Sequence, residues 1–341
     1  MSVFEPRFLN SFKRCEFCDI IVMFGRKPRM KSLEQVEREL DELRRFGVRS
    51  AFFVDDNLIG NLPVAKKLLQ FLKEYQERHD YRFSFGTEAS LNMAQHSDLL
   101  ELFRAANFGW VFIGIESTDP ASLQETLKTQ NLHEDILVSV RRIYSHGIEV
   151  LAGFIIGFDH DTLESFEQQY QFITDAGIQS AMIGLLTALP KTPLYDRLKR
   201  EGRLNTLDDV NDMTRPATNV IPKNMDYEAM VDGYLALYRR LLQDREIANR
   251  IRNKLRHLAP TKYRTSYSAS QALGILWRVI RKGILSGGPR RIWHFLRTLP
   301  FLKPRFFSIV ISEWVVALSM REFAERRLAP GMAQIPPLLA D

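Results

Sequence analysis

The feature that most constrains the fold is a strand–helix rhythm that repeats every 30 to 40 residues or so. Short apolar runs typical of buried strands alternate with segments whose apolar residues recur at helical spacing. We expect strands at residues 50–54, 81–86, 110–115, 149–156 and 180–186. We expect helices at residues 33–46, 63–79, 98–106, 133–146 and 162–176. Repeated strand–helix units predict an α/β fold with a parallel sheet and right-handed crossovers.

The rhythm alone leaves open whether the sheet is flat and doubly wound or curved toward a barrel. Polar residues cluster where the expected strands end, at residues 55–57, 87–88 and 116–117. Both architectures place their active sites at the carboxyl ends of parallel strands. The sequence therefore predicts a functional site at this edge, whichever way the sheet closes.

The rhythm ends near Leu204. Residues 205–224 carry two prolines and predict an irregular linker. Asp226 is expected to cap a helix that reaches about Gln243. Basic helical segments that also carry aromatic residues follow it.

The whole chain has a net charge of +6, and its positive charge is concentrated in the later part. From Arg239 to Arg305 there are seventeen Lys or Arg and two Asp or Glu; the remainder holds 47 − 17 = 30 basic and 41 − 2 = 39 acidic residues. Such a block favours contact with nucleic acid or an anionic membrane surface, and the alternative is a solvated helical face. No RNA-binding motif is visible, so nucleic acid is not an expected partner.

The cysteine count indicates a reducing compartment. Cys15 and Cys18 are the only two cysteines, too few for a disulfide framework. Residues 1–14 lack the apolar core of a signal peptide, and the apolar stretch 306–320 is too short to span a bilayer and contains Glu313. We therefore expect a cytoplasmic protein that is at most peripheral on the inner face of the membrane.

Cys15-Glu16-Phe17-Cys18 is a CxxC motif, which alone fits a redox dithiol, half of a zinc site or part of an iron–sulfur site. No second CxxC and no nearby pair of histidines supports structural zinc. A thioredoxin-like protein would place the motif at a helix start after a strand in a smaller fold. The motifs that follow in the chain favour the iron–sulfur reading.

An ordered series of motifs resembles the radical S-adenosylmethionine (SAM) superfamily, in the branch that carries a cobalamin-binding domain and includes hopanoid methylases and relatives of the bacteriochlorophyll cyclase. The resemblance extends over about residues 15–328. Its motifs lie at residues 15–20, 24–29, 52–61, 87–90, 114–117, 153–159, 192–195 and 312–322.

The resemblance implies a partial (β/α)6 TIM-type barrel with a helical C-terminal extension. It implies a [4Fe-4S] cluster and S-adenosylmethionine as cofactors, with cobalamin only if another chain supplies it. We expect four segments: a degraded remnant of the first strand and cluster loop, the radical SAM partial barrel, a mostly helical extension and a loose tail. Their expected bounds are residues 1–14, 15–204, 205–330 and 331–341.

The family's cluster is held by three cysteines in the pattern C-x3-C-x2-C. Cys15 and Cys18 match the last two, but the first position is Ser11. Thiolate is the soft ligand that such clusters prefer, and a serine hydroxyl is seldom ionised near neutral pH. The resemblance also implies that a first strand and an upstream cobalamin domain precede this sequence in the family.

Further site residues are implied by the resemblance alone. Phe17 would lie against the adenine of SAM, and the remaining positions lie at strand ends that would face its amino group, its ribose, its adenine or the substrate. These candidates are Asp55, Asp56, Asn57, Glu88, Glu116, Gly153 and Gly157. For each one, an ordinary structural role in the core, in a turn or in an ion pair is the alternative.

Two functional hypotheses follow. In the first, the protein is an enzyme that cleaves SAM reductively to modify an unactivated carbon. The expected reaction is methylation of a hydrophobic or lipid-like small molecule. The expected electron donor is a protein such as flavodoxin or ferredoxin. In the second, it is a non-catalytic remnant that folds but does not hold the cluster, as Ser11 suggests. A third idea adds peripheral membrane contact through the basic segment Arg239–Arg305.

Overall fold

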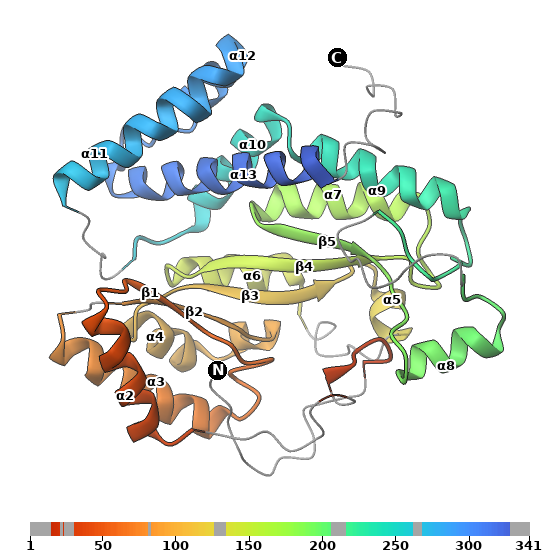
Figure 1. Cartoon of the computed structure of the whole chain (residues 1–341), viewed down its shortest axis with the longest axis horizontal. Coiled ribbons are helices and arrows are strands. Elements are labelled where there is room, and N and C mark those ends of the chain that lie inside the picture. Colours follow the sequence, from red (N-terminus) through yellow and green to blue (C-terminus); the bar gives the residue numbers. More distant parts are fainter. Residues whose placement is uncertain are drawn as a thin grey trace.

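The computed structural model describes residues 15–20, 23, 31–80, 83–125, 134–205, 216–261 and 268–327. Its centre is a five-stranded sheet in which every neighbouring pair of strands is parallel (Figure 1). The strands are β1 (Ser50–Phe53), β2 (Ser84–Glu88), β3 (Phe108–Glu116), β4 (Glu149–Ile156) and β5 (Ala181–Leu185). The predicted parallel α/β sheet is therefore confirmed.

The order of the strands resolves the choice that the rhythm left open. They follow one another as β1-β2-β3-β4-β5, so each strand pairs with the next one along the chain. A doubly wound sheet reverses its strand order at a switch point, whereas a barrel adds strands in one direction. The fold is thus a partial barrel of the TIM type with five strands in the described residues, and the sheet is not closed. The expected first strand, within residues 1–14, lies outside the described residues.

The helices between the strands begin and end where the sequence supplies caps. Ser32 forms a capping box with Gln35, Asn61 caps the second helix, and Asp135 caps the fourth. The helices of this layer are α2 (Leu33–Arg45), α3 (Leu62–Arg78), α4 (Ser97–Ala105), α6 (Ile136–Ser145) and α7 (Glu164–Ala176). Two short helices that the rhythm did not predict are α5 (Pro120–Glu125) and α8 (Pro193–Arg200).

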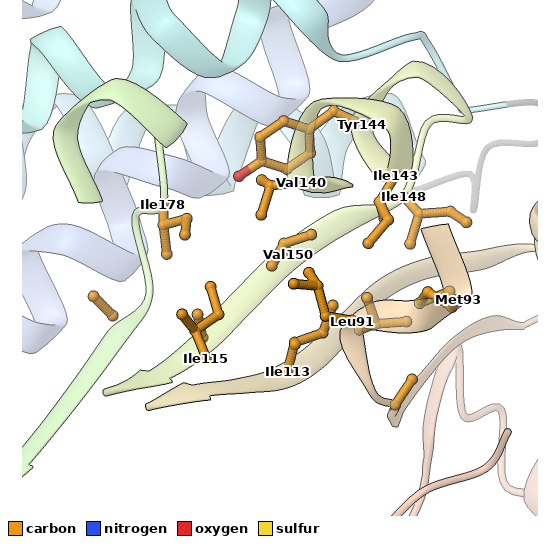
Figure 2. Packing of buried hydrophobic residues seen from close by; sticks show 14 of the residues in the cluster. Leu91, Met93, Ile113, Ile115, Val140, Ile143, Tyr144, Ile148, Val150 and Ile178 are labelled. Atoms are coloured by element: carbon orange, nitrogen blue, oxygen red, sulfur yellow. The ribbon is translucent and has the colours of Figure 1, made fainter. Parts of the chain in front are cut away.

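The core lies between the sheet and these helices. Figure 2 shows Ile113 and Ile115 of β3 and Val150 of β4 pointing toward Val140 and Ile143 of α6. All five side chains are fully buried. The other face of the sheet is more open, because residues there, such as those of β3 and β4, alternate with the buried ones.

The C-terminal extension packs on the barrel. It contains α9 (Tyr227–Leu241), capped by Asp226 as predicted, and α10 (Asp244–His257), which contacts α6 and α7. It continues with α11 (Ala269–Arg278), a π-helical turn (Val279–Ile284), α12 (Gly288–Leu296) and α13 (Phe307–Arg327). None of the helices in the described part of the chain combines the length and apolar character needed to cross a bilayer.

A buried ionic group joins the extension to the sheet. The Nζ atom of Lys254 on α10 lies 2.8 Å from Glu313 on α13 and 3.1 Å from Glu149 at the start of β4. Burial raises the pKa of Glu313 to about 8. Burial would also raise the pKa of Glu149, but the Lys254 charge and a hydrogen bond with Glu313 hold it below its usual value. Near neutral pH the group therefore holds one positive and one negative charge, with the proton on Glu313.

Candidate functional site

The CxxC motif forms a turn at the carboxyl end of the sheet. The Cys18 N–H donates to the carbonyl of Cys15 over 3.2 Å, and both side chains are half-buried. The Phe17 ring lies against the ring of Phe158, with 5.9 Å between centroids, and Phe158 follows the end of β4. The Leu194 N–H, in the first turn of α8, donates to the carbonyl of Glu16 over 3.0 Å. The cysteines thus lie at the edge where a functional site was predicted.

Arg197 of α8 clamps this turn. Its Nε and Nη2 atoms bind the two oxygens of the Glu16 carboxylate, inside the CxxC motif, over 2.6 and 3.1 Å. The same guanidinium reaches Glu125 of α5 over 3.2 Å and Asp159 over 2.7 Å. A bidentate pair fixes orientation as well as distance. Arg197 therefore ties the cysteine turn to the segments that follow β3, β4 and β5.

A second cation, Arg203, binds one of the carboxylates that Arg197 contacts. Arg203 forms an ion pair with Asp159 at 2.7 Å. Burial raises the pKa of Asp159, but hydrogen bonds from Arg203 and Arg197 outweigh burial and hold that pKa below its usual value. At Glu125, by contrast, burial and the neighbouring Asp159 charge raise the pKa. The sequence reasoning missed this network, although Asp159 and the start of α8 lie in the quoted motifs.

A cluster of carboxylates lies at the carboxyl ends of β1 and β2. Burial raises the pKa of Asp55, and burial together with the Asp19 charge raises the pKa of Asp56. Burial and the charges of Asp56 and Asp55 raise the pKa of Glu88. These groups therefore repel one another, and a cation placed among them would lower their pKa values and be bound in return. Among the described residues, the charged groups that shift the pKa of Glu88 are the carboxylates of Asp56 and Asp55.

Asn57 has a structural task. Its side-chain amide donates to Ser90 Oγ over 3.1 Å and accepts from the Ser90 N–H over 3.2 Å. The Asn57 N–H donates to Asp55 Oδ1, and the Leu58 N–H donates to the Glu88 carbonyl. Asn57 thus fastens the loop after β1 to the loop after β2, which holds the carboxylates together. This contact matches the alternative of a polar turn more closely than a ligand role.

Glu116 ends β3 in an unusual backbone conformation. Its φ is +67°, and the pairing of β3 with β4 shifts between Gly114 and Glu116. A β-bulge of this kind re-aims a side chain at the end of a strand. Gly153, two strand positions before Ile155, lies beneath the ring of Phe112, whose nearest atom would be 3.2 Å from an added Cβ. The close approach at Gly153 is therefore to an aromatic side chain of the open face.

Gly157 shapes the end of β4. Its φ is +119°, and an added Cβ would lie 3.2 Å from Leu186. Its N–H and that of Phe158 both donate to Asp161 Oδ2, over 2.9 and 3.1 Å, and the other oxygen of Asp161 accepts from Ser122. The Gly157 N–H is thus already used by the protein. Asp161 is a further residue that the sequence reasoning missed.

This strain gives a prediction. Gly157→Ala is expected to lower the free energy of unfolding by about 1–3 kcal/mol, because a Cβ forces both a disfavoured φ and a contact with Leu186. Gly184→Ala, where an added Cβ meets nothing within 4 Å, is the control and should change it by no more than about 0.5 kcal/mol. Urea unfolding measures both. Equal effects of the two substitutions would contradict the assignment of strain to Gly157.

The open face of the sheet is aromatic below these strand ends. Phe52 of β1 and Trp110 of β3 stack with 4.9 Å between centroids and 4° between planes. Trp110 covers Gly86 of β2 so closely that an added Cβ would lie 2.3 Å from the indole. Met182 of β5, on the same face, is largely exposed. The site therefore combines an acidic rim with an apolar floor.

The donors present match a cluster only in part. Cys15 and Cys18 offer two thiolates with the spacing of two of the three family ligands. In the described part of the chain, no group of three or more His, Cys, Asp or Glu residues could hold a metal ion. A third protein ligand would have to come from elsewhere, and Ser11 lies outside the described residues.

A half-barrel with a cysteine turn at the carboxyl edge of its strands defines a class of cofactor-binding α/β proteins. Profile comparison specifies the class: the radical SAM superfamily matches residues 12–173, and a domain of unknown function, DUF4070, matches residues 192–329. The chain belongs to the radical SAM superfamily.

Curated relatives of the chain include methylases. The chain is 42% identical over 298 residues to the hopanoid C-2 methylase of Rhodopseudomonas palustris, covering 83% of this chain and 54% of that protein. It is 26% identical over 249 residues to bacteriochlorophyllide d C-12(1)-methyltransferase of Chlorobaculum tepidum, covering 70% and 51%. The chain thus spans about half the length of the curated relatives that it matches.

Solved structures show the same fold at low identity. The radical SAM methyltransferase TsrM of Kitasatospora setae, with cobalamin and a [4Fe-4S] cluster bound, superposes with a TM-score of 0.54 at 15% identity, over 94% of this chain and 60% of that one. The cobalamin-dependent SAM radical enzyme OxsB, with aqua-cobalamin and SAM bound, gives 0.50 at 16% identity, over 96% and 55%. These matches confirm the partial-barrel fold.

Proposed function

We propose that this chain is the SAM-binding core of a methylase, which modifies an unactivated carbon of a hydrophobic or lipid-like small molecule. The observation that carries the proposal is the position of the Cys15–Cys18 turn beside the acidic rim of the sheet, in a chain 42% identical to a hopanoid methylase over 298 residues. A bound cluster would supply the electron that cleaves SAM, delivered by a donor such as flavodoxin or ferredoxin. Cobalamin would come from another chain or from a segment outside this sequence.

The protein's own residues have definable tasks in this proposal. Cys15 and Cys18 provide two thiolates, and Arg197 holds their turn through Glu16. We assign Phe17, Gly153 in β4 and Gly157 after it to the adenine, and Glu116 to the ribose or the substrate. The rim formed by Asp55, Asp56 and Glu88 supplies negative charge for the amino group of SAM. The apolar floor excludes water and suits a hydrophobic substrate.

The acidic rim gives a prediction for SAM binding. Affinity should rise as the pH rises through the raised pKa values of Asp55, Asp56 and Glu88, because only the ionised carboxylates attract the cation. Glu88→Gln should weaken binding about tenfold at neutral pH and flatten this pH dependence. Isothermal titration with SAM measures both effects. The control is Glu164→Gln, the same change of charge at an exposed position on α7.

Enzymatic activity is tested by anaerobic reconstitution with iron and sulfide, followed by an assay for SAM cleavage under reducing conditions. The proposal expects 5′-deoxyadenosine or S-adenosylhomocysteine as a product. The absence of both products, from reconstituted protein that binds SAM, would overturn the proposal.

A second function has one observation in its favour. Ser11 occupies the position of the first cluster cysteine, so the chain would fold without holding a cluster. In that case Ser11→Cys should raise iron content, and the unchanged chain should bind SAM without cleaving it. The membrane contact expected for the segment Arg239–Arg305 is likewise a proposal.

A further inference from the structure

The helical extension exposes an unusual number of large apolar side chains. Phe301 is 79% exposed, Leu302 97%, Leu273 65%, Trp293 61% and Trp277 60%. Four more between residues 273 and 307 are also exposed: Ile275, Leu285, Leu296 and Phe307. Scattered apolar residues on a surface are ordinary, but a concentration of this kind marks a contact surface. We call residues 273–307 the apolar–basic surface.

These residues are exposed although their helices pack well on the other side. Ile284, Phe295 and Trp314 are buried in a core of their own beneath the apolar–basic surface. The Trp314 indole donates to Thr298 Oγ1 over 3.0 Å, which fixes α13 against the end of α12. Figure 1 shows α11 and α12 standing out from the body of the molecule, away from the sheet. The two outward tryptophans are therefore displayed by ordered helices.

Exposed apolar residues pair on one side of each helix, although Ile275 lies on another side of α11. Leu273 and Trp277 lie four residues apart on α11, and Trp293 and Leu296 lie three apart on α12. Residues at these spacings lie on the same side of a helix. Phe301 and Leu302 lie in the connection between α12 and α13, where they form an apolar tip.

The charge of this surface has one sign. Residues 247–312 contain no Asp or Glu. The exposed cations on the surface are Arg278, Arg281, Lys282, Arg290, Arg297, Lys303 and Arg305. Other basic residues of the expected segment Arg239–Arg305 serve the interior: Arg250 donates to the Leu241 carbonyl, and Lys254 binds two glutamates. Arg245, Arg252 and Arg256, earlier in that segment, are exposed as well, so the apolar–basic surface carries part of its outward charge.

We propose that the apolar–basic surface docks on an anionic lipid bilayer. Exposed cations gain attraction from anionic headgroups, and Trp, Phe and Leu enter the boundary between headgroups and acyl chains. Nucleic acid would satisfy the cations but would leave the aliphatic side chains, above all Leu302, in water. The bilayer is the one partner that uses both properties of the surface.

Flotation with vesicles tests the proposal. The full chain is mixed with vesicles of phosphatidylcholine alone or with about one third phosphatidylserine. Binding should require phosphatidylserine and weaken with added salt. The double variant Phe301→Ser/Leu302→Ser should reduce the bound fraction about tenfold. Phe46→Ser, at an equally exposed apolar side chain outside the surface, is the control and should bind as the unchanged chain does. Thermal unfolding checks that each variant folds.

Three results would overturn the proposal: binding that is indifferent to phosphatidylserine, equal loss in the double variant and the control, or capture by a single-stranded oligonucleotide in place of vesicles. Self-association that the double variant abolishes, without vesicle binding, would assign the surface to a second copy and also overturn it. The inference sharpens the membrane contact proposed above. Because the assay needs neither iron nor SAM, its failure leaves the enzymatic proposal to its own test.

Discussion

Lys254→Met is expected to lower the free energy of unfolding by about 3–5 kcal/mol, the largest effect of a single substitution that we predict. The change removes the cation that lies between Glu149 and Glu313 and leaves their carboxyl groups facing each other in the interior. Because the three residues lie on β4, α10 and α13, the extension should loosen from the barrel. Urea unfolding monitored by circular dichroism measures the effect.

The proton on Glu313 allows a matched control. Glu313→Gln keeps a neutral side chain where the buried acid already holds its proton, so it should cost less than about 1.5 kcal/mol. Glu149→Gln removes the ionised partner of Lys254 and should cost more. A carboxyl group whose pKa is raised on folding stabilises the fold less as the pH rises toward that pKa. The unchanged chain should therefore lose stability from about pH 4.5, the ordinary pKa of Glu, to about pH 8, and Glu313→Gln should lose less. Equal costs for the two glutamine variants would contradict this assignment.

Arg197→Met is expected to free the cysteine turn. It removes the bidentate hold on Glu16 and leaves Glu125 and Asp159 with less positive charge nearby. The site is partly exposed, so screening limits the loss of stability to about 2 kcal/mol. The thiols of Cys15 and Cys18 should react several times faster with a maleimide. Without the ion pair between Arg197 and Glu16, the turn can open locally without first breaking that contact.

Arg200→Met changes an exposed arginine on the same helix and should leave thiol reactivity unchanged. Arg197→Lys should restore the charge but not the bidentate geometry. Its thiol reactivity should therefore fall between that of Arg197→Met and that of Arg200→Met. Thiol reactivity that is the same in all three variants would show that Arg197 does not hold the turn.

The sheet was predictable because its information is local. Five apolar runs and the polar residues between them identify the strands and helices, and Asp226 caps a helix as expected. Strand ends were less certain: the strand expected at 81–86 is described as Ser84–Glu88, so Glu88 belongs to β2 rather than following it. Hydrophobic pattern locates a strand, but pairing with its neighbours determines where it ends.

The contacts that build the site were not predictable, because they join distant segments. Arg197 and Glu16 lie 181 residues apart, and nothing in the spacing of either indicates the pair. The same holds for the extension, where the excess of basic residues does not indicate which cations face inward. Lys254 is 2% exposed and Arg250 equally buried, although both belong to the basic segment. Charge composition counts residues, and only packing decides which of them meet solvent.

The central claim is that the Cys15–Cys18 turn anchors an iron–sulfur cluster beside the acidic rim. It is tested most directly by iron and acid-labile sulfide analysis of anaerobically reconstituted protein, with the Cys15→Ala and Cys18→Ala variants in parallel. The account predicts about four iron and four sulfide per chain, lost in either variant. Iron-free protein, or an iron content that neither alanine substitution changes, would contradict it.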